Sequence, residues 1–576
     1  MSVHNADIAA IFEEIADLLE IQGENPFRIR AYRNAARQME SMGVPAADMV
    51  AKGEDLTELP GIGDDLAAKI REIVETGKCR ALEKLHQQLP PTLTELLKIP
   101  GLGPKRVKTL YQQLKINTLE QLKRAARDGK IHELPGFGDK TEAAIRDALA
   151  AHAETAPRFK LAVAAQYAEP LVAYLKKSRN VKQVEIAGSY RRCKETVGDL
   201  DILATTKGAS DVMDRFVKYD EVKDVPAHGE TRATVRLKCG LQVDLRVVPA
   251  ESFGAALQYF TGSKAHNIEI RRLGQERKLK INEYGVFRGE KRIAGDTEES
   301  VYRAVGLPWI APELRENRGE IEAAHKDKLP KLVELGDLKG DLHVHTTATD
   351  GHHTLKEMAA AARARELEYF AITEHSRRLT VAHGLDPHRL RKQMEEIDRL
   401  NEQLKGVTIL KGVEVDILED GSLDLPDDVL AECDLVVGAV HSKFHLPRAK
   451  QTTRILRAME RPCFSILAHP TGRLLEAREP YDVDMLKIIR QAKERGCFLE
   501  LNAHPERLDL LDIHCQMAKD EGVLVAINSD SHRLQDFDNL KYGVGQARRG
   551  WLAKDDVLNT RPLKLLRPLL QRTIKS

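Results

Sequence analysis

The second half of the chain alternates short apolar runs with helical stretches, and this alternation constrains the fold more than any other feature. Seven apolar runs follow one another after residue 340. Short apolar runs separated by helical segments are typical of parallel βα units that close into a barrel. The expected strands are Leu342–His345, Tyr369–Thr373, Thr408–Val415, Leu435–Val440, Ser465–Ala468, Phe498–Leu501 and Leu524–Ile527.

Histidines and carboxylates stand at the carboxyl ends of nearly all these expected strands, where the active sites of such barrels lie. One such histidine alone is more often a core or surface residue than a ligand. Nine residues in this arrangement are too many for that explanation and too many for one ion. Mixed imidazole and carboxylate ligands suit Zn²⁺, Mn²⁺ or Fe²⁺ better than Ca²⁺. We therefore predict two or three ions and hydrolysis of a phosphoester. The candidates are His343, His345, Asp350, His375, Glu414, His441, His469, Asp530 and His532.

Three carboxylates mark a second candidate metal site, in a stretch from about 155 to 250 that also alternates strands and helices. Asp199 and Asp201 lie two apart on an extended segment and so share a face, and Asp244 lies in another expected strand. Three carboxylates on one sheet face suit a pair of Mg²⁺ ions that stabilise an in-line phosphoryl displacement. Ser189 and Arg192, just upstream, suit a triphosphate. The expected strands are Val184–Ala187, Ile202–Ala204, Ala233–Leu237 and Gln242–Val248.

The first 150 residues have helical periodicity throughout and contain an internal repeat. The pattern Leu/Ile-Pro-Gly-X-Gly begins at positions 59, 99 and 134, and a helical segment follows each copy. The glycines allow the positive φ angles of a tight hairpin, and the amides after it open a helix, which attracts phosphate. The repeat resembles the helix-hairpin-helix motif, which grips a DNA backbone without reading sequence. The expected contacts are Gly61, Gly63, Gly101, Gly103, Lys105, Gly136, Gly138 and Lys140.

Residues 1–315 resemble a family X DNA polymerase. GSYRRCKETVGDLDI at 188–202 is similar to the palm signature of that family, YFTGS at 259–263 to its nucleotide-selecting segment, and NEY at 282–284 to a thumb segment. The resemblance implies that Asp199, Asp201 and Asp244 hold Mg²⁺ or Mn²⁺, with Asp244 as the carboxylate nearest the primer 3′-hydroxyl. It also implies dNTP contacts from Gly188, Ser189, Arg192, Gly198, Tyr259, Phe260, Gly262, Asn267 and Arg271.

The second half resembles the polymerase and histidinol phosphatase (PHP) domain, through the segments DLHVHT, TEH, GVEVD, VHS, AHP and SDSH. The nine candidate ligands match that family's ligand positions. The resemblance therefore implies two or three Mn²⁺ or Zn²⁺ ions at this site. Asn502 and Arg507 are expected to contact a phosphate. The resemblance implies a bacterial polymerase that fills short gaps in base excision repair. It adds a 3′–5′ exonuclease and leaves room for abasic-site endonuclease and 3′-phosphatase activities. The implied partners are gapped or nicked duplex DNA and dNTPs.

Two segments near the N-terminus, NPFRIRAYRNAARQM and LPGIGDDLAAKIREIVETGK, resemble the lyase-type domain of the polymerase family. Lys69 occupies the place of the lysine that forms a Schiff base with an abasic sugar. Asp65 stands where the family often has a second lysine, and Phe27 replaces a polar phosphate contact. Weakened phosphate binding is therefore expected, and an exposed helical lysine is the favoured interpretation, with a lyase nucleophile as the alternative.

We therefore expect a multidomain chain with three architectures. They are an all-α helix-hairpin-helix region, an α+β nucleotidyltransferase palm with a thumb, and a C-terminal α/β PHP domain with a distorted seven-stranded barrel. The expected domains are a lyase-like domain at 1–90, a fingers-type domain at 91–152, the palm at 153–250, the thumb at 251–318, a charged helical linker at 319–340 and the PHP domain at 341–576.

Composition limits the remaining classes. Apolar runs fall far short of the roughly 20 residues of a membrane span, and the N-terminus lacks a secretory signal core. Seven dispersed cysteines without a CxxC pair indicate reduced thiols and a cytoplasmic location. The net charge of +1 excludes a simple polycation, but the segment 264–292 holds nine basic residues and four Glu. The resemblance implies that this segment is the thumb and binds duplex DNA. We also expect the protein to be a monomer.

Three other functions stay open at this point. A nucleotidyltransferase that tails RNA or modifies small molecules is disfavoured by the hairpins and by YFTGS. A phosphatase of a small ester such as histidinol phosphate would turn that substrate over faster than it resects DNA ends. A DNA-end scaffold with two vestigial sites is disfavoured by the complete ligand sets.

Overall fold

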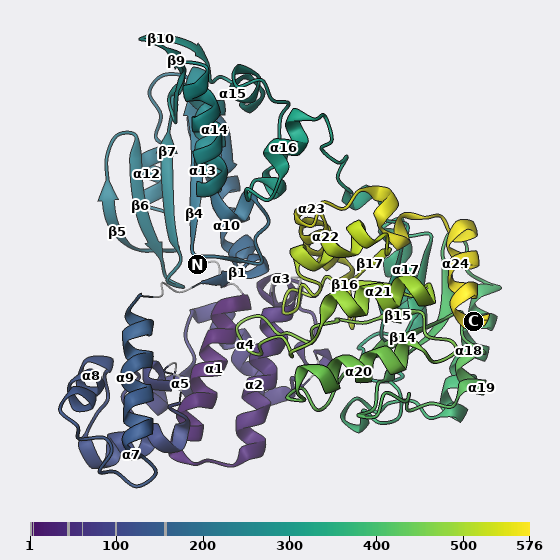
Figure 1. Cartoon of the computed structure of the whole chain (residues 1–576). Helices are drawn as coiled ribbons and strands as arrows, with labels where there is room; N and C mark the ends of the chain where they lie inside the picture. Colours follow the sequence, from purple (N-terminus) through teal and green to yellow (C-terminus); the bar gives the residue numbers. More distant parts are fainter. Residues whose placement is uncertain are drawn as a thin grey trace. The chain divides into compact units, whose positions relative to one another are not determined.

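The computed structural model describes residues 3, 5–42, 46–59, 61–97, 99, 101–154 and 158–575 (Figure 1). Two compact units share these residues. The first comprises Met1–Arg158, Asp220–Lys223 and Leu237–Leu241, and the second comprises Phe159–Tyr219, Asp224–Arg236 and Gln242–Ser576. Among the described residues, no helix is long and apolar enough to cross a membrane.

The N-terminal part of the first unit is helical, as the sequence predicts. Two apolar cores hold it together, and helix α1 contributes Ile8 and Phe12 to one and Ile21 to the other. The side chain of Asn25 caps α2 by accepting a bond from the Phe27 N–H, with a proline next in the chain. The elements are α1 (Asn5–Gln22), α2 (Pro26–Ser41), α3 (Ala46–Lys52), a 3₁₀ helix (Leu56–Glu58), α4 (Asp64–Thr76), α5 (Arg80–His86), α6 (Leu93–Leu97), α7 (Pro104–Leu114), α8 (Leu119–Arg127) and α9 (Asp139–Glu154).

A five-stranded sheet of order β2-β4-β7-β6-β5 forms the palm. Its strands are β2 (Val181–Ile186), β4 (Asp199–Thr206), β5 (Val222–His228), β6 (Arg232–Leu237) and β7 (Gln242–Val247). Strand β4 runs parallel to β7, and β2 and β6 run antiparallel to their partners β4 and β7. The sequence predicts four of the five strands and misses β5. This edge strand is mostly exposed and contains Pro226, so it lacks the apolar alternation that marks a buried strand.

Three helices and a two-stranded sheet accompany this five-stranded sheet. Helix α11 leads from β2 toward the paired strands β1 and β3, and it carries the start of the palm signature. The elements are β1 (Phe159–Lys160), α10 (Leu161–Lys176), α11 (Gly188–Arg191), β3 (Thr196–Val197) and α12 (Val212–Val217).

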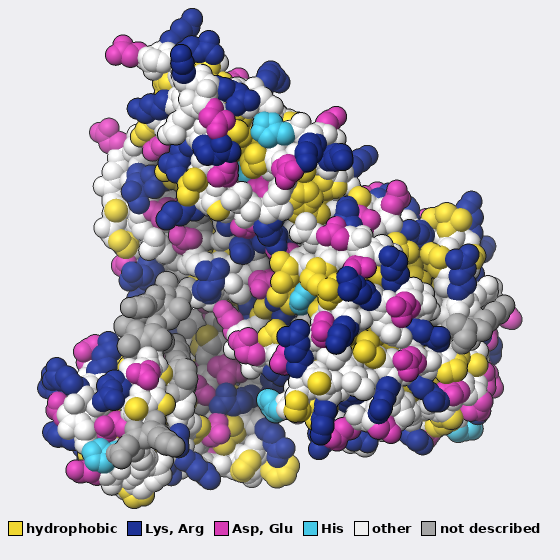
Figure 2. Space-filling model, viewed as in Figure 1, with side chains coloured by type: hydrophobic (Ala, Val, Ile, Leu, Met, Phe, Trp, Pro, Cys, Tyr) yellow, Lys and Arg dark blue, Asp and Glu magenta, His cyan; other side chains and the backbone are white. Residues whose placement is uncertain are grey.

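The basic segment 264–292 folds into a helix and a small sheet that form the thumb. The thumb also includes the helices before and after this segment, and its elements are α13 (Phe253–Thr261), α14 (Lys264–Glu276), β8 (Lys280–Asn282), β9 (Gly285–Arg288), β10 (Lys291–Ala294) and α15 (Glu298–Ala304). Apolar side chains including Ile270, Val301 and Tyr302 form its core. Figure 2 shows Lys and Arg side chains gathered over the tip made by β9 and β10, at the top of the view. This arrangement puts the basic charges of the segment on the surface of the thumb.

The segment 319–340, expected to be a helical linker, is helical only over α16 (Glu320–His325) and a 3₁₀ turn (Leu335–Asp337). Glu320 is fully buried and accepts a bond from His266 Nδ1 at 2.7 Å, which fastens α16 to the thumb. Leu332 packs in the thumb core, and the next residue, Val333, packs in the core of the C-terminal domain. The segment is therefore packed on both neighbours.

The C-terminal domain is a seven-stranded parallel barrel with strands in sequence order. A β-bridge between Val344 and Ser531 joins the first strand to the residues after the last strand and nearly closes the barrel. The strands are β11 (Gly340–Val344), β12 (Tyr369–Ile372), β13 (Thr408–Asp416), β14 (Leu435–Ala439), β15 (Ile466–Leu467), β16 (Phe498–Asn502) and β17 (Val525–Asn528). Every expected strand is present.

Helices follow most of these strands and pack around them (Figure 1). They are α17 (Leu355–Ala364), α18 (Pro387–Asn401), α19 (Asp427–Leu430), α20 (Arg448–Met459), α21 (Met485–Arg495), α22 (Asp512–Glu521), α23 (Leu540–Arg549) and α24 (Leu563–Lys575). The alternation of strand and helix brings the carboxyl ends of all seven strands to one rim.

Candidate active sites

The register of two palm strands brings the three expected carboxylates together. Strand β4 pairs with β7 so that Asp201 lies directly beside Asp244, and the two-residue period puts Asp199 on the same face. Burial, reinforced by the charges of Asp199 and Asp244, raises the pKa of Asp201 to about 7. Crowded carboxylates of this kind are stabilised by a divalent cation, and an all-oxygen donor set fits Mg²⁺ or Mn²⁺. The donor set therefore fits the metals implied by the sequence.

Side chains of the neighbouring strand β6 and of β7 itself fix the orientation of Asp244, and the sequence reasoning missed them. The Thr234 hydroxyl donates to Asp244 Oδ1 from the adjacent strand β6, and Gln242 Nε2 donates to Oδ2 at 3.1 Å. An Arg232 nitrogen lies 3.6 Å from Oδ1. Only the strand register reveals Thr234 and Arg232 as partners, whereas Gln242 precedes Asp244 by two residues on the same strand.

Gly188 allows α11 to begin directly beside the carboxylates. Its φ is +63°, and a Cβ there would lie 2.9 Å from Asp201 Oδ2. At the other end of this segment, Arg192 donates from Nε to Glu316 Oε1 at 3.0 Å and from Nη1 to the Thr261 carbonyl. Its charge lowers the pKa of Asp201, against the larger effect of burial. The triphosphate candidates Gly188 and Arg192 thus flank the carboxylates, and the half-buried Ser189 and Gly198 lie in the same segment.

The aromatic pair Tyr259 and Phe260 ends helix α13 beside this segment. Their rings meet edge to face at 5.1 Å, and the Arg246 guanidinium lies 4.4 Å from the centre of the Phe260 ring. Gly262 follows with φ +70°, and a Cβ there would lie 3.2 Å from Arg192 Nη1. A side chain at position 262 would therefore crowd the arginine expected to bind the triphosphate.

Asn267, expected to contact the incoming dNTP, makes internal hydrogen bonds in this structure. It is buried, its Nδ2 donates to the Tyr259 carbonyl at 2.7 Å, and its Oδ1 accepts from Gln258 at 2.8 Å. In this structure its amide therefore holds the turn between α13 and α14. Arg271, one helical turn further on, is exposed and bonds the Asn267 carbonyl at 3.3 Å through Nε.

The nine expected ligands of the barrel meet at its carboxyl-end rim. Eight of them form three overlapping groups, each with donor atoms within 4.8 Å of one another. The ninth, His469, has its Nε2 at 3.0 Å from Glu414 Oε1. The groups are His345, Asp350, His375 and His532; His343, His345 and Asp530; and His375, Glu414 and His441.

Several donor atoms of this cluster are buried without a hydrogen-bond partner among the described residues. They include His343 Nε2, both ring nitrogens of His345, Glu414 Oε2 and His441 Nδ1. Burying unpaired polar atoms is costly, and divalent cations satisfy imidazole and carboxylate lone pairs together. Burial and the nearby rings of His532 and His375 lower the pKa of His345 to about 4, which keeps that ring neutral, as a ligand must be. The cluster therefore fits several transition-metal ions.

A shell of buried residues that the sequence reasoning missed supports the ligands. His343 Nδ1 lies 2.6 Å from Glu500 Oε1, a pair that leaves His343 Nε2 directed at the cluster. Glu374, after β12, accepts from the hydroxyls of Thr346 and Thr349. A signal existed for Glu500, because it is a lone charge inside the apolar run of β16.

The two expected phosphate contacts of the barrel differ in placement. Asn502 Nδ2 donates to Glu500 Oε2 at 3.2 Å and to Asp530 Oδ2 at 3.0 Å, so its amide group holds the ligands in place. Both bonds are internal, and the phosphate contact expected of Asn502 stays a prediction. Arg507 Nε lies 3.8 Å from Asp530 Oδ2, at the edge of the cluster, where a phosphate could meet it.

The three hairpins of the first unit have the backbone expected of them. Gly61, Gly101 and Gly136 have φ of +67°, +88° and +84°, values that favour glycine. Gly63 and Gly103 are the N-cap residues of α4 and α7, and Gly138 directly precedes α9. Lys105 is exposed on the first turn of α7, whereas the side chain of Lys140 lies outside the described residues.

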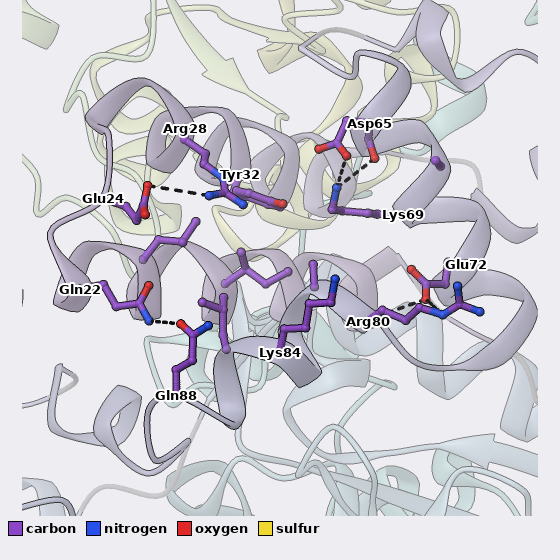
Figure 3. Close-up of a pocket in the computed structure, with 15 residues that line it drawn as sticks. Gln22, Glu24, Arg28, Tyr32, Asp65, Lys69, Glu72, Arg80, Lys84 and Gln88 are labelled. Carbon is purple, nitrogen blue, oxygen red and sulfur yellow. Dashed lines mark hydrogen bonds and ion pairs between the residues drawn. The ribbon is translucent and has the colours of Figure 1, made fainter.

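Lys69 lies in a pocket of about 540 Å³ between α1, α2, α4 and α5 (Figure 3). Its side chain is 14% exposed, and Nζ pairs with the Asp65 carboxylate and lies 3.3 Å from the Asp65 carbonyl. Tyr32 and the basic residues Arg28, Arg80 and Lys84 also line the pocket. Lys69 is therefore not an exposed helical lysine, and the sequence reasoning missed Arg80 and Lys84.

Five known domain families match successive parts of the chain. They are a helix-hairpin-helix domain at residues 3–79, a SAM-like helix-hairpin-helix tandem at 93–151, the DNA polymerase beta palm at 157–236, the DNA polymerase beta thumb at 256–316 and the PHP domain at 341–504. The order of these matches is the order of the expected architectures.

One relative matches from end to end. The DNA polymerase/3′-5′ exonuclease PolX of Bacillus subtilis (strain 168) is 40% identical over 577 residues, which cover 99% of this chain and all of the relative. The chain belongs to family X of the DNA polymerases. This membership confirms the family and the fold class expected from the sequence.

This family X chain also has relatives that match only part of it. A probable phosphatase of Thermoanaerobacter sp. (strain X514) is 30% identical over 235 residues, 38% of this chain and 89% of the relative. A probable phosphatase of Acetivibrio thermocellus is 33% identical over 205 residues, 33% of this chain and 78% of the relative. Proteins named as probable phosphatases are therefore similar to part of this chain.

Proposed function

We propose that this family X chain is a template-directed DNA polymerase that fills short gaps in DNA repair and carries a 3′–5′ exonuclease in its PHP domain. The observation that carries the proposal is the presence of two separate centres of metal-ligand type in one chain. One is the carboxylate set on β4 and β7, and the other is the nine-residue cluster at the barrel rim. The full-length match to a DNA polymerase/3′-5′ exonuclease supports the pairing of these two activities.

In the palm, Asp199, Asp201 and Asp244 would hold Mg²⁺ or Mn²⁺, and Asp244 would be the carboxylate nearest the primer 3′-hydroxyl. The segment of α11 would bind the triphosphate through Gly188, Ser189, Arg192 and Gly198. Tyr259, Phe260 and Gly262 would crowd the sugar and exclude a 2′-hydroxyl, with Arg271 toward the template. Asn267 would act on the same pocket through the turn that it holds.

In the barrel, the nine ligands would hold two or three Mn²⁺ or Zn²⁺ ions. Such ions supply a strong nucleophile from water at neutral pH and a clamp for phosphate oxygens. Glu500 keeps His343 oriented, and Arg507 offers a guanidinium to the scissile phosphate at the rim. The same site suits abasic-site endonuclease and 3′-phosphatase reactions, since both cleave a phosphoester at a DNA end or lesion.

The helical region would bring gapped or nicked DNA to both centres. The hairpin residues Gly61, Gly63, Gly101, Gly103, Lys105, Gly136, Gly138 and Lys140 would bind backbone phosphates. Lys69 would be a lyase nucleophile if DNA displaces Asp65, and the nearby Arg28 and Lys84 would take the 5′-phosphate. We propose the domain limits stated from the sequence, a monomer, and action in the cytoplasm.

A 5′-phosphorylated one-nucleotide gap with a labelled primer tests the proposal. Wild type, Asp244→Ala and His343→Ala are compared in Mn²⁺, with and without dNTPs. Asp244→Ala should lose extension but still shorten the primer, and His343→Ala should do the reverse, so each variant controls for the folding of the other. Loss of both activities in both variants would contradict two independent centres.

A second outcome would redirect the proposal for the PHP domain. If wild type extends the primer but never shortens it, a small phosphate ester becomes the better substrate, in line with the relatives named as phosphatases. Turnover of histidinol phosphate by wild type, lost in His343→Ala, would then identify that class.

A further inference from the structure

An arginine of the PHP domain, Arg549, forms hydrogen bonds with the palm segment that is expected to bind the triphosphate. Arg549 is the last residue of α23, and its side chain is only 4% exposed. Its Nη1 donates to the backbone carbonyl of Arg192 at 2.8 Å and to Glu316 Oε1 at 2.9 Å. Its Nη2 donates to Asp512 Oδ2, in the PHP domain itself, at 2.8 Å. Arg549 thus bridges its own domain to the residue expected to bind a triphosphate.

Glu316 stands between two guanidinium groups. Its Oε1 accepts from Arg192 Nε at 3.0 Å and from Arg549 Nη1 at 2.9 Å. Although burial raises the pKa of Glu316, the charges of Arg192 and Arg549 outweigh it and hold that pKa below its usual value. Glu316 therefore stays ionised, and it ties the side chain of Arg192 to Arg549.

The PHP end of this chain of bonds is also anchored. Asp512 Oδ2 accepts from Arg549 and, at 3.0 Å, from Arg318 Nη2, while Arg318 also bonds the Arg549 carbonyl at 3.1 Å. The side chains of Arg192, Glu316 and Asp512 are 12%, 14% and 16% exposed. Charge-assisted bonds between such shielded groups are shorter and stronger than those at a surface, so the network is a stiff support.

We infer that Arg549 is a positioning residue for the nucleotide site of the polymerase. It fixes both the backbone and, through Glu316, the side chain of Arg192, and so presents that guanidinium to the incoming triphosphate. Arg549 itself does not touch the nucleotide. The inference rests on the proposed polymerase function of the palm, and it makes nucleotide affinity depend on a residue of the PHP domain.

The neighbouring residue provides a matched control. Arg548 Nε donates to Glu313 Oε1 at 2.7 Å, and Arg548 Nη1 donates to the Val333 carbonyl at 3.1 Å. It therefore makes an ion pair of similar length between α23 and the end of the thumb, but none of its bonds reaches Arg192 or Glu316. Loss of interface contacts in general would affect both arginines alike, whereas loss of positioning would affect Arg549 alone.

The test measures nucleotide binding without chemistry. The full chain in Mg²⁺ is bound to gapped DNA whose primer ends in a dideoxynucleotide and a phosphorothioate linkage, so that the primer is neither extended nor shortened. The Kd of the matching dNTP is measured for wild type, Arg549→Gln, Arg549→Lys and Arg548→Gln. We expect a Kd about tenfold higher for Arg549→Gln, the size of one charge-assisted bond, and a smaller rise for Arg549→Lys. The Kd for DNA and the exonuclease rate on an unmodified primer should stay at wild-type values.

Two results would overturn the inference: a Kd for Arg549→Gln within twofold of wild type, or an equal rise in Arg548→Gln. If Arg549→Gln does not fold, Asp512→Asn serves instead, because it removes the anchor of Arg549 and should raise the Kd for dNTP in the same way. A wild type that binds dNTP but never incorporates it refutes the proposed function and leaves this test valid. A wild type that binds no dNTP refutes both.

Discussion

The two centres of this chain solve the same problem of holding divalent cations in opposite ways. The palm uses three carboxylates from two paired strands, and one of them, Asp199, is exposed. The barrel gathers nine candidate ligands from the ends of its strands, and His343, His345 and Glu414 are at most 1% exposed. An open site suits a reaction that must admit a DNA end and a nucleotide together, whereas a buried cluster of ligands suits ions that stay bound. The activity of the palm should therefore depend strongly on each of a few residues, whereas metal binding in the barrel should be shared among many residues.

The largest expected effect comes from the palm, since each of its three ligands is a third of the donor set. Asp201→Ala should lower the rate of dNTP incorporation by about 1000-fold, or roughly 4 kcal/mol of transition-state stabilisation. The primer-shortening rate of the same protein is the internal control. The comparison fails if Asp201→Ala keeps more than a tenth of the incorporation rate.

The next prediction concerns the buried ion pairs next to α11, the helix expected to bind the triphosphate. These pairs contribute to the stability of the fold rather than to metal binding. Glu298 bonds Arg191, at the end of α11, and the buried Arg315. Burial alone would raise the pKa of Glu298, but Arg315 and Arg191 lower it to about 2. Its folded pKa thus lies below the unfolded value, so the stabilisation is present above about pH 4.5 and is lost as the pH falls toward 2.

Glu298→Gln should therefore lower the free energy of unfolding at pH 7 by roughly 3 kcal/mol, because the two arginines lose their buried partner. Urea unfolding at pH 7 and pH 3 measures the effect, which should shrink at the lower pH. Glu290→Gln, on the exposed turn of the thumb sheet, is the control and should change little. An equal loss at both pH values would mean that the ion pair is not the cause.

A third prediction asks whether the barrel cluster depends on its support as well as on its ligands. Glu500→Gln weakens the bond that orients His343, so the Mn²⁺ concentration for half-maximal exonuclease activity should rise about 10- to 100-fold. The Mg²⁺ dependence of polymerisation should not change. Glu402→Gln, at an exposed helix end, is the matched control. An unchanged Mn²⁺ requirement would show that the ligand cluster keeps its geometry without the bond between Glu500 and His343.

The smallest expected effect tests the corresponding support in the palm. Thr234→Val removes the hydroxyl that donates to Asp244, and incorporation should slow about tenfold. Thr205→Val, on β4 of the same sheet, removes a buried hydroxyl that has no hydrogen-bond partner among the described residues, and it should have no such effect. Equal single-turnover rates for the two variants would remove Thr234 from the site.

The sequence predicts the barrel closely because each buried parallel strand is a short, nearly continuous apolar run. It misses β5 because an exposed edge strand has no such run. The site ligands are predictable from their chemistry, whereas their supports are not. Thr234 reaches Asp244 only through strand register, and Glu500 reaches His343 only through the closure of the barrel.

Asn267 illustrates a different limit. Its place in the chain matches a residue expected to face the base pair, but its amide bonds the end of α13 in this structure. Whether a polar side chain points into a site or holds a turn depends on hydrogen-bond partners that lie several residues away in the sequence and are not part of the motif. Residue type and spacing alone do not decide between the two.

Within the segment 319–340, the change from the thumb core to the core of the PHP domain takes place across a single peptide bond. Leu332 is buried in one core and Val333 in the other, and the Val333 N–H donates to the Leu552 carbonyl at 3.0 Å. Most multidomain proteins offer a protease an exposed tether between their domains. Here a cut between these two residues would open two hydrophobic cores at once, so the packing of both domains depends on this one bond.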